Sequence, residues 1–402
     1  MTQNTPTEMN RLSERVDAVE PQQIRVMFDL AEQQDGDLVH LELGEPDFET
    51  PEHIVEAASE AARNGRTKYT SNAGIHELRS AIATKLSSEG GREIDPDNEV
   101  LVTTGGVEAL HLSIHAVADP GDEVVVPTPA WPNVIEQARL AGAVPVEVPM
   151  PAENDFEPDT EAILEAIGPD TAAVSLTAPS NPTGRVIPEA GIERIVEAAA
   201  EHGAYVLADE VYRELTYEDI PPRIERITDH EEWVLSINSL SKTYAMTGWR
   251  VGWVTGPADV IEVMTTIHEY TTSCVNTPAQ YAGIAALTGP HEPIDRMKET
   301  FQSRREYVLE RLAEIPAVSA GRPEGGFYVF IDVSALEGSS MAIAKRLLRE
   351  YGVVTAPGTA FGKGGEGHLR ISFANDIDRI ELGLDRFESM IRSELEEPST
   401  PE

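Results

Sequence analysis

Seven short apolar runs constrain the fold of this 402-residue chain more than any other feature. They are rich in Val, Ile or Ala, and most lack the apolar–polar alternation of a half-exposed strand, which favours a mostly parallel sheet covered on both faces. Helical patterns lie between several of them, at residues 107–117 and 188–202. The sequence therefore predicts an α/β domain with a seven-stranded sheet and ligands bound beyond the carboxyl ends of its strands. The runs are residues 100–103, 123–126, 144–148, 172–176, 205–208, 234–237 and 251–255.

The pattern changes after about residue 285. A long polar helical stretch at residues 293–314 precedes two apolar strands, 326–332 and 369–373, with a helix between them at 341–351. This arrangement predicts a second, smaller α+β domain, against which a helical segment at residues 24–34 could pack. We expect residues 46–284 to form the large domain, whose sheet would bind the ligand. Residues 1–45 and 285–402 would form the small one.

The charge of the chain limits its partners. It carries 70 acidic and 31 basic residues, a formal net charge of −39. Such a field repels nucleic acids and anionic membrane surfaces, so neither is an expected partner. The acid is spread along the chain and lysines are few, which looks like an adaptation to high salt, where self-repulsion is screened.

Three absences from the sequence bear on location and metals. No apolar run approaches the ~20 residues of a membrane span, and the first 25 residues lack the apolar region of a signal peptide. The prediction is a cytoplasmic protein. Cys274 is the single cysteine and the histidines form no ligand-spaced cluster, so no metal site is expected.

The most informative segment joins a buried strand to a lysine. Lys242 follows the run at residues 234–237 almost at once, which puts it at the edge of the sheet where ligands bind. Burial lowers the pKa of a lysine, as a nucleophile that attacks a carbonyl carbon requires. Ser239, Ser241 and Arg250 provide the donors that a phosphate group needs.

The motif S-x-S-K-x-x-x-M-T-G-W-R, from Ser239 to Arg250, resembles the cofactor-lysine motif of class I aminotransferases. These are pyridoxal-phosphate (PLP) enzymes of fold type I. Four other segments agree in order and spacing, so the resemblance runs from about Arg25 to Arg386. It implies PLP as the cofactor and Lys242 as its covalent attachment point and catalytic acid–base.

The resemblance also implies the other cofactor contacts. Free amides where a strand turns through two glycines into a helix would cradle the phosphate. Trp131 would stack on the pyridine ring, and Asp209 would pair with the protonated ring nitrogen. Asn181 and Tyr212 would donate hydrogen bonds to the phenolic oxygen of the ring. The amides of the phosphate cradle would come from Gly105, Gly106 and Val107.

Substrate and subunit contacts follow from the same resemblance. Arg370 would bind the α-carboxylate of the substrate through a bidentate fork. Gly44, Asn181 and Trp131 would line the substrate site beside it. Tyr69 would reach the cofactor phosphate of a neighbouring subunit, which implies a homodimer.

The implied activity is transfer of an amino group from an L-amino acid to a 2-oxo acid such as 2-oxoglutarate. The pattern looks like relatives active on aspartate or aromatic amino acids. Some aspartate-selective relatives have a lysine at the position of Val107. This chain therefore lacks one positive charge that could bind the side-chain carboxylate of the substrate. Two alternatives are a PLP-dependent carbon–sulfur β-lyase and a non-enzymatic PLP-binding module. The module fits poorly, because the chain is acidic and has no room for a DNA-binding domain.

Overall fold

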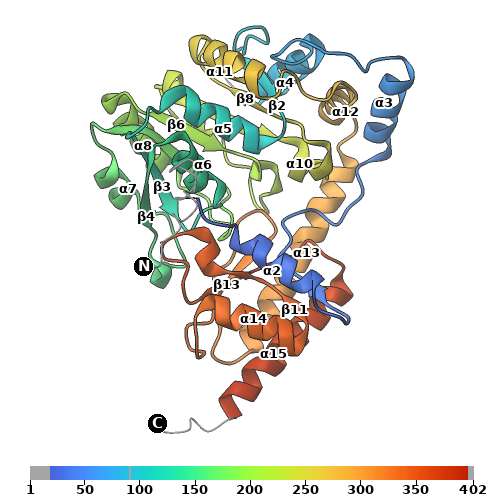
Figure 1. The fold of residues 1–402 in the computed structure, drawn as a ribbon, viewed down its shortest axis with the longest axis vertical. Helices are drawn as coiled ribbons and strands as arrows, with labels where there is room; N and C mark the ends of the chain where they lie inside the picture. Colours follow the sequence, from blue (N-terminus) through green and yellow to red (C-terminus); the bar gives the residue numbers. More distant parts are fainter. Residues whose placement is uncertain (1–18, 90–91, 397–402) are drawn as a thin grey trace, which may run out of the picture.

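The computed structural model describes residues 19–89 and 92–396, and its largest element there is a seven-stranded sheet (Figure 1). Neighbouring strands run parallel except at β8, which is antiparallel to both of its neighbours. All seven apolar runs form strands, with ends shifted by at most two residues. The predicted mostly parallel α/β sheet is confirmed. In spatial order the strands are β2 (Val100–Thr103), β8 (Gly252–Thr255), β7 (Val234–Ser239), β6 (Tyr205–Asp209), β5 (Thr171–Thr177), β3 (Glu123–Thr128) and β4 (Val144–Pro149).

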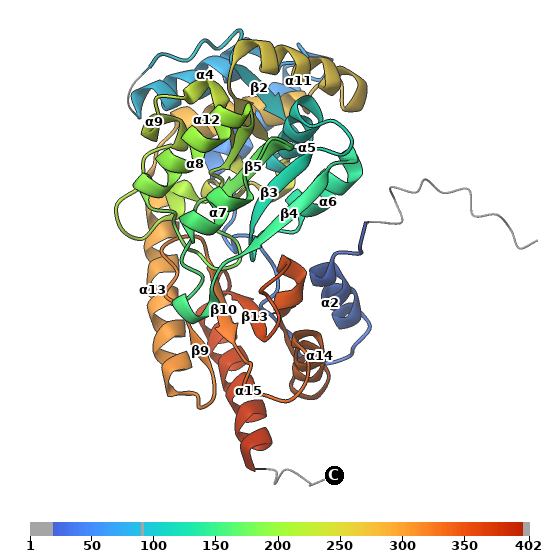
Figure 2. The same cartoon turned by 90° about the vertical axis from the view of Figure 1, so that its left-hand side faces the viewer.

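Helices cover both faces of this sheet, which explains why its strands do not alternate between apolar and polar residues. Val124 and Val126 pack in one apolar cluster with α5 (Gly106–Val117), α6 (Asn133–Ala141) and α11 (Ala258–Thr271). Val125, which points the other way, packs with α7 (Thr160–Ala166) and α8 (Glu189–His202). Figure 2 shows α5 and α6 on one side of β3 and β4, with α7 and α8 on the other.

The other edge of the sheet has its own cover. Val100 and Val102 pack with α4 (His76–Ser88) and α12 (Thr277–Thr288), and α12 also contacts α3 (Glu52–Arg63). Because successive strand residues point to opposite faces, every second apolar residue finds a different helix layer.

A smaller antiparallel sheet lies below the large one in Figure 1. Its order is β12 (Ala356–Pro357), β13 (His368–Ser372), β10 (Tyr328–Asp332) and β9 (Ser319–Ala320). Around it lie α13 (Glu292–Glu314), α14 (Ser340–Tyr351) and α15 (Ile377–Glu396). The predicted helices and strands of this part of the chain are therefore present.

The amino-terminal part of the described chain joins the smaller sheet. Helix α2 (Gln23–Glu32) packs against β12 and α14. Strand β1 (Val39–His40) then pairs in parallel with β11 (Val353–Val354). Short helices, α9 (Ile224–Ile227) and α10 (Leu240–Thr243), and 3₁₀ turns complete the fold. The turns are Ala152–Asn154, Arg213–Leu215, Glu231–Trp233, Thr247–Trp249 and Gly358–Phe361.

The two sheets share apolar side chains where they meet. Tyr212 and Leu215, which follow β6 of the large sheet, belong to the core of the small one with Phe327 and Tyr328. In return, Phe330 of β10 packs in the cluster beneath β5 and β6. This exchange fixes the carboxyl ends of β5 and β6 against β10 and β13. Within residues 19–89 and 92–396, no helix combines the length and the apolar character needed to cross a bilayer.

Candidate active site

A cavity of about 200 Å³ lies where the carboxyl ends of β5, β6 and β7 face β10 and β13. Sequence reasoning selected fourteen candidate site residues, and most of them meet here. They come from both sheets and from the loop after β1. The candidates that line the cavity are Gly44, Gly106, Val107, Trp131, Asn181, Asp209, Tyr212, Ser239, Ser241, Lys242, Arg250 and Arg370.

Lys242 lies in α10, directly after β7. The helix begins there because the Ser239 hydroxyl accepts a hydrogen bond from the Ser241 amide at 3.1 Å, which caps its first turn. The Lys242 Nζ atom donates to the Gly44 carbonyl oxygen. The pKa of Lys242 is lowered to about 8, mainly by burial, with Arg370 and Arg250 acting in the same direction and Glu45 and Asp209 opposing them. A large fraction of this amine is therefore neutral near pH 8.

Asp209 ends β6, beside β7, and its carboxylate faces the same cavity. Its Oδ1 atom accepts a hydrogen bond from the Val211 amide at 3.2 Å. The pKa of Asp209 is raised to about 6, mainly by burial; the hydrogen bond from Val211 and the charge of Lys242 oppose the rise, while the neighbouring Glu210 adds to it. No ion pair to Asp209 is formed by the described residues. A carboxylate held in this way is suited to pair with a cationic group in the cavity.

Arg370 is 1 % exposed and lies on β13, opposite Phe330 of β10. Its Nη1 atom donates to Asn181 Oδ1 at 3.0 Å, and its Nη2 atom donates to the Glu42 carbonyl oxygen. The buried Nε atom has no partner. Without a carboxylate partner of its own, this guanidinium has donors left for an anionic group.

The other end of the cavity has the donors for a phosphate. Gly105 precedes α5 with φ of 77°, a conformation that favours glycine, and the first amides of the helix are free of helical partners. A Cβ atom on Gly105 would lie 2.6 Å from Arg250 Nη2, so the guanidinium rests against this turn. The Ser239 and Ser241 hydroxyls lie 2.9 Å apart on the facing side.

These groups fit pyridoxal phosphate. Amides at a helix start, two hydroxyls and a guanidinium match a phosphate. A carboxylate without a cationic partner matches a protonated ring nitrogen, and a lysine of lowered pKa matches covalent attachment. Gly105 does not line the cavity itself and supports it from behind through Arg250.

Tyr69 is not part of this cavity. Its side chain is 90 % exposed in the loop between α3 and α4. The preceding residue anchors that loop, because the Lys68 carbonyl oxygen accepts a hydrogen bond from the Thr277 hydroxyl at 2.7 Å. Within one subunit, Tyr69 faces solvent.

Sequence reasoning missed several residues that line the cavity, among them Ile24, Glu42, Thr177 and Tyr328. Tyr328 is joined to another residue of the site. Its hydroxyl lies 2.9 Å from that of Tyr212. Tyr328 lies within the apolar run at residues 326–332 that predicts a strand, and that pattern gives no sign that this tyrosine reaches the site.

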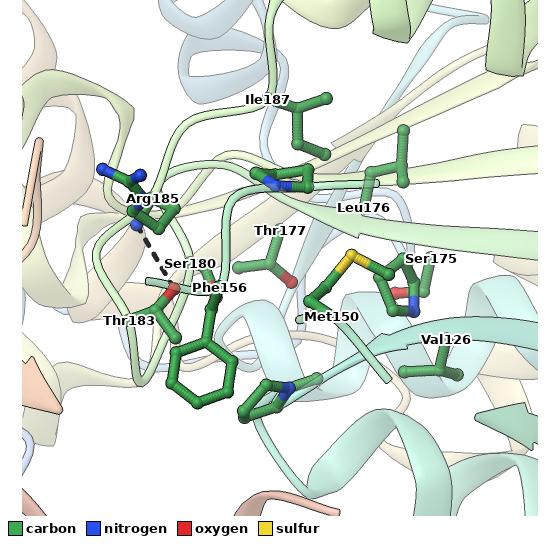
Figure 3. A pocket seen from close by; sticks show the side chains of 14 residues that line it. Val126, Met150, Phe156, Ser175, Leu176, Thr177, Ser180, Thr183, Arg185 and Ile187 are labelled. Atoms are coloured by element: carbon green, nitrogen blue, oxygen red, sulfur yellow. Dashed lines mark hydrogen bonds between the residues drawn. The ribbon is translucent and has the colours of Figure 1, made fainter. Parts of the chain in front are cut away.

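A second cavity, of about 40 Å³, lies beside the first and shares Thr177 with it. Figure 3 shows its wall, where Val126, Met150, Phe156 and Leu176 surround a space with Ser175 at one side. It has room for a few water molecules. Its small volume makes it unsuitable for a cofactor, although Thr183 and Arg185 add polar groups to its wall.

Comparisons with known proteins show the family to which the chain belongs. The family model described as aminotransferase class I and II matches residues 36–387. The aspartate aminotransferase of Pyrococcus abyssi is 38% identical, over 95% of this chain and 98% of that protein. The aspartate/prephenate aminotransferase of Thermus thermophilus is 40% identical, over 94% of this chain and 98% of that protein.

Solved structures of relatives have the same fold. That of the Thermus thermophilus aspartate aminotransferase with maleate superposes with a TM-score of 0.90 at 40% identity, over 95% of this chain and 100% of that one. That of the Pyrococcus horikoshii aromatic aminotransferase gives 0.86 at 35% identity, over 92% and 99%. The chain is a pyridoxal-phosphate-dependent transaminase of fold type I and belongs to the class I and II aminotransferase family.

Proposed function

We propose that Lys242 attaches PLP and moves the proton while an amino group passes from an L-amino acid to a 2-oxo acid such as 2-oxoglutarate. The observation that carries this proposal is the convergence on one cavity of Asp209 at the end of β6, Lys242 directly after β7 and Arg370 in the middle of β13. When bound, the cofactor supplies an electron sink for the carbanion formed at the substrate Cα.

Each residue has a distinct task in the proposed reaction. Arg370 and Asn181, already joined at 3.0 Å, bind the substrate α-carboxylate beside Gly44. Lys242, with its pKa lowered to about 8 by burial, accepts a proton from the substrate Cα and returns it to the product. The carboxylate of Asp209 pairs with the protonated ring nitrogen.

The remaining contacts hold the cofactor in place. Trp131 covers one face of the ring, and Asn181 and Tyr212 donate to its phenolic oxygen. The phosphate is bound by amides at the start of α5 and by the donors of the lysine segment. These are Gly106, Val107, Ser239, Ser241 and Arg250, which line the cavity, with Gly105 in the turn directly before the helix.

The proposed donors are aromatic amino acids and aspartate. Ile24, Leu43 and Val107 make part of the cavity wall apolar, which suits an aromatic side chain. Among the described residues, the lysines and arginines that line the cavity are Lys242, Arg250 and Arg370, and each already has a task. Relatives named for aspartate, prephenate and aromatic amino acids support a broad range.

The test is a half-reaction without acceptor. Purified protein with PLP is mixed with L-phenylalanine or L-aspartate, and the visible absorbance is followed before 2-oxoglutarate is added. Transamination predicts loss of the absorbance with each donor and its return with the oxo acid. Continuous release of pyruvate and sulfide from cysteine without any oxo acid would instead identify a carbon–sulfur β-lyase.

We also propose a homodimer in which Tyr69 reaches the phosphate of the partner subunit's cofactor. Two observations support it. Tyr69 is 90 % exposed and lies outside the cavity of its own subunit. Its loop is nevertheless held at a fixed place on α12 through the Lys68 carbonyl.

The division into domains and the high-salt habitat are proposals of the same kind. Residues 46–284 would move as one body, and residues 1–45 with 285–402 as the other. Separate sheets support this division, although their cores share side chains. The net charge of −39 supports adaptation to high salt. The predicted cytoplasmic location stays a prediction.

A further inference from the structure

Two buried tyrosines join the two sheets inside the cavity. Tyr212 follows β6 of the large sheet and Tyr328 begins β10 of the small one. Their hydroxyl oxygens lie 2.9 Å apart, and their rings meet edge to face with centroids 5.8 Å apart. Among the described residues, neither hydroxyl has a hydrogen-bond partner other than the other tyrosine. Loss of the Tyr328 hydroxyl would therefore remove the hydrogen bond to the Tyr212 hydroxyl.

Tyr328 also lies against two further parts of the site. The Arg370 guanidinium carbon is 4.3 Å from the centroid of its ring, within cation–π distance. A Cβ atom on Gly44 would lie 2.6 Å from the Tyr328 hydroxyl oxygen, so a residue without a side chain is needed there. The carbonyl of the same Gly44 accepts the hydrogen bond from Lys242. These contacts with Arg370, Gly44 and Tyr212 restrict the position of the Tyr328 hydroxyl.

The direction of the hydroxyl–hydroxyl bond decides where the proton of Tyr212 points. A phenol has one proton to donate and can also accept. Burial raises the pKa of both phenols, so both keep their protons at neutral pH. The guanidinium against the ring of Tyr328 withdraws electron density, which makes that hydroxyl the stronger donor. A bond donated by Tyr328 to Tyr212 leaves the proton of Tyr212 for an acceptor in the cavity.

We infer that Tyr328 is a positioning residue that orients the Tyr212 hydroxyl as a donor toward the phenolic oxygen of the bound cofactor. The inference rests on the proposed cofactor contact of Tyr212. It extends that contact to a residue of the small sheet, so the substrate-binding Arg370 and the cofactor donor Tyr212 are held by one side chain.

The test uses the pH midpoint at which the visible absorbance of the PLP-loaded enzyme changes. A donated hydrogen bond stabilises negative charge on the phenolic oxygen and so lowers this midpoint. Tyr328→Phe keeps the ring against Arg370 and removes the hydroxyl. The midpoint should rise by about 0.5–1 pH unit, the size expected for weakening one hydrogen bond. Tyr212→Phe should raise it at least as much.

The double variant shows whether Tyr328 acts through Tyr212. Adding Tyr328→Phe to the Tyr212→Phe enzyme should leave the midpoint unchanged, because the hydroxyl that it orients is already gone. The matched control is Tyr217→Phe, which removes another buried tyrosine hydroxyl, bonded to the Gly326 carbonyl and outside the cavity. Its midpoint should equal that of the unsubstituted enzyme.

Two results would overturn the inference. One is an unchanged midpoint in Tyr328→Phe, and the other is an equal rise in the presence and absence of the Tyr212 hydroxyl. Both are distinct from failure of the proposed function, in which the unsubstituted protein would show no visible PLP absorbance that a donor removes. An enzyme that transaminates normally but shows either result keeps the function and loses this inference.

Discussion

Single residues in the cavity have protonation equilibria shifted by burial. The pKa of Lys242 falls to about 8 and that of Asp209 rises to about 6, because water is excluded from both charged forms. A cationic ring nitrogen beside Asp209 would reverse the second shift, since the buried carboxylate would gain a partner. The free cavity is therefore electrostatically unfavourable for Asp209 in a way that the bound cofactor relieves.

The raised pKa of Asp209 predicts a pH-dependent cost in the PLP-free protein. A carboxyl whose pKa is higher in the folded state binds its proton more tightly there, so the stability it contributes is present at low pH. That contribution is lost as pH rises from about 4, the usual value, through about 6. At pH 7.5, PLP-free Asp209→Asn should therefore melt about 2–4 °C above the unsubstituted PLP-free protein.

Calorimetry measures the melting temperatures of the two PLP-free proteins. Measurement near pH 4 is the control, because the difference between them should vanish there. With PLP bound, the order should reverse, and the half-reaction of the variant should be slower by about two orders of magnitude, the cost of breaking a buried ion pair. Equal melting temperatures of the two PLP-free proteins at pH 7.5 would show that Asp209 is not strained by burial.

Elements of secondary structure were predictable where burial is complete along a strand. Strands β2 and β7 are buried at every position, and their apolar runs stand out between polar segments. The two-residue strands β1, β9, β11 and β12 were not predicted, because so short a segment carries no periodicity. The single reversed strand, β8, depends on how its chain returns across the sheet, which no local pattern encodes.

The site was predictable to the extent that it lies in motifs next to strand ends. Lys242 and Asp209 each follow a buried run within a recognisable segment. Tyr328 and Glu42 reach the cavity only through packing between the two sheets, so neither spacing nor composition points to them. Their discovery required the tertiary structure.

The turn before α5 yields a prediction at the scale of an element. Gly105→Ala places a methyl group 2.6 Å from Arg250 Nη2, which must move away from the phosphate cradle. Gly65→Ala is the matched control, because Gly65 has φ of 76° against 77° for Gly105, with nothing within 4 Å of the added Cβ. Both variants share a backbone cost of about 1–2 kcal/mol.

Only Gly105→Ala should weaken PLP binding, by about tenfold or more, as expected when a charged phosphate contact is displaced. Equilibrium dialysis with PLP measures this directly. If the dissociation constants of the two variants were equal, the turn before α5 would not be the phosphate site.

The net charge of the whole molecule predicts that its stability depends on salt. A net charge of −39 destabilises the folded state by self-repulsion at low ionic strength. Between 0.1 and 2 M KCl the melting temperature at pH 7.5 should rise by about 5–10 °C, because the screening length falls well below the spacing of surface charges. The rise should shrink near pH 4.5, where many carboxylates bind protons. A melting temperature independent of KCl would refute adaptation to high salt.

Subunit composition gives a second prediction at this scale. If Tyr69 completes the partner's site, Tyr69→Ala and Lys242→Ala proteins are each nearly inactive as homodimers. Unfolded and refolded together in equal amounts, they form mixed dimers in which one site holds both Lys242 and Tyr69. Random pairing should restore about a quarter of the unsubstituted activity. No recovery, despite mixed dimers seen by native mass spectrometry, would exclude a shared site.

The central claim is that Lys242 holds PLP for transamination, and one absorbance measurement tests it most directly. The unsubstituted protein and Lys242→Ala are loaded with PLP in high salt, and the absorbance of one portion of each is recorded before and after an L-amino acid is added without an oxo acid. A second portion, without the donor, is treated with borohydride and digested for mass spectrometry. The account predicts visible absorbance that the donor removes, with the pyridoxyl group recovered on Lys242 alone and absent from the variant. Absorbance that no donor changes, or a pyridoxyl group on another lysine, would contradict it.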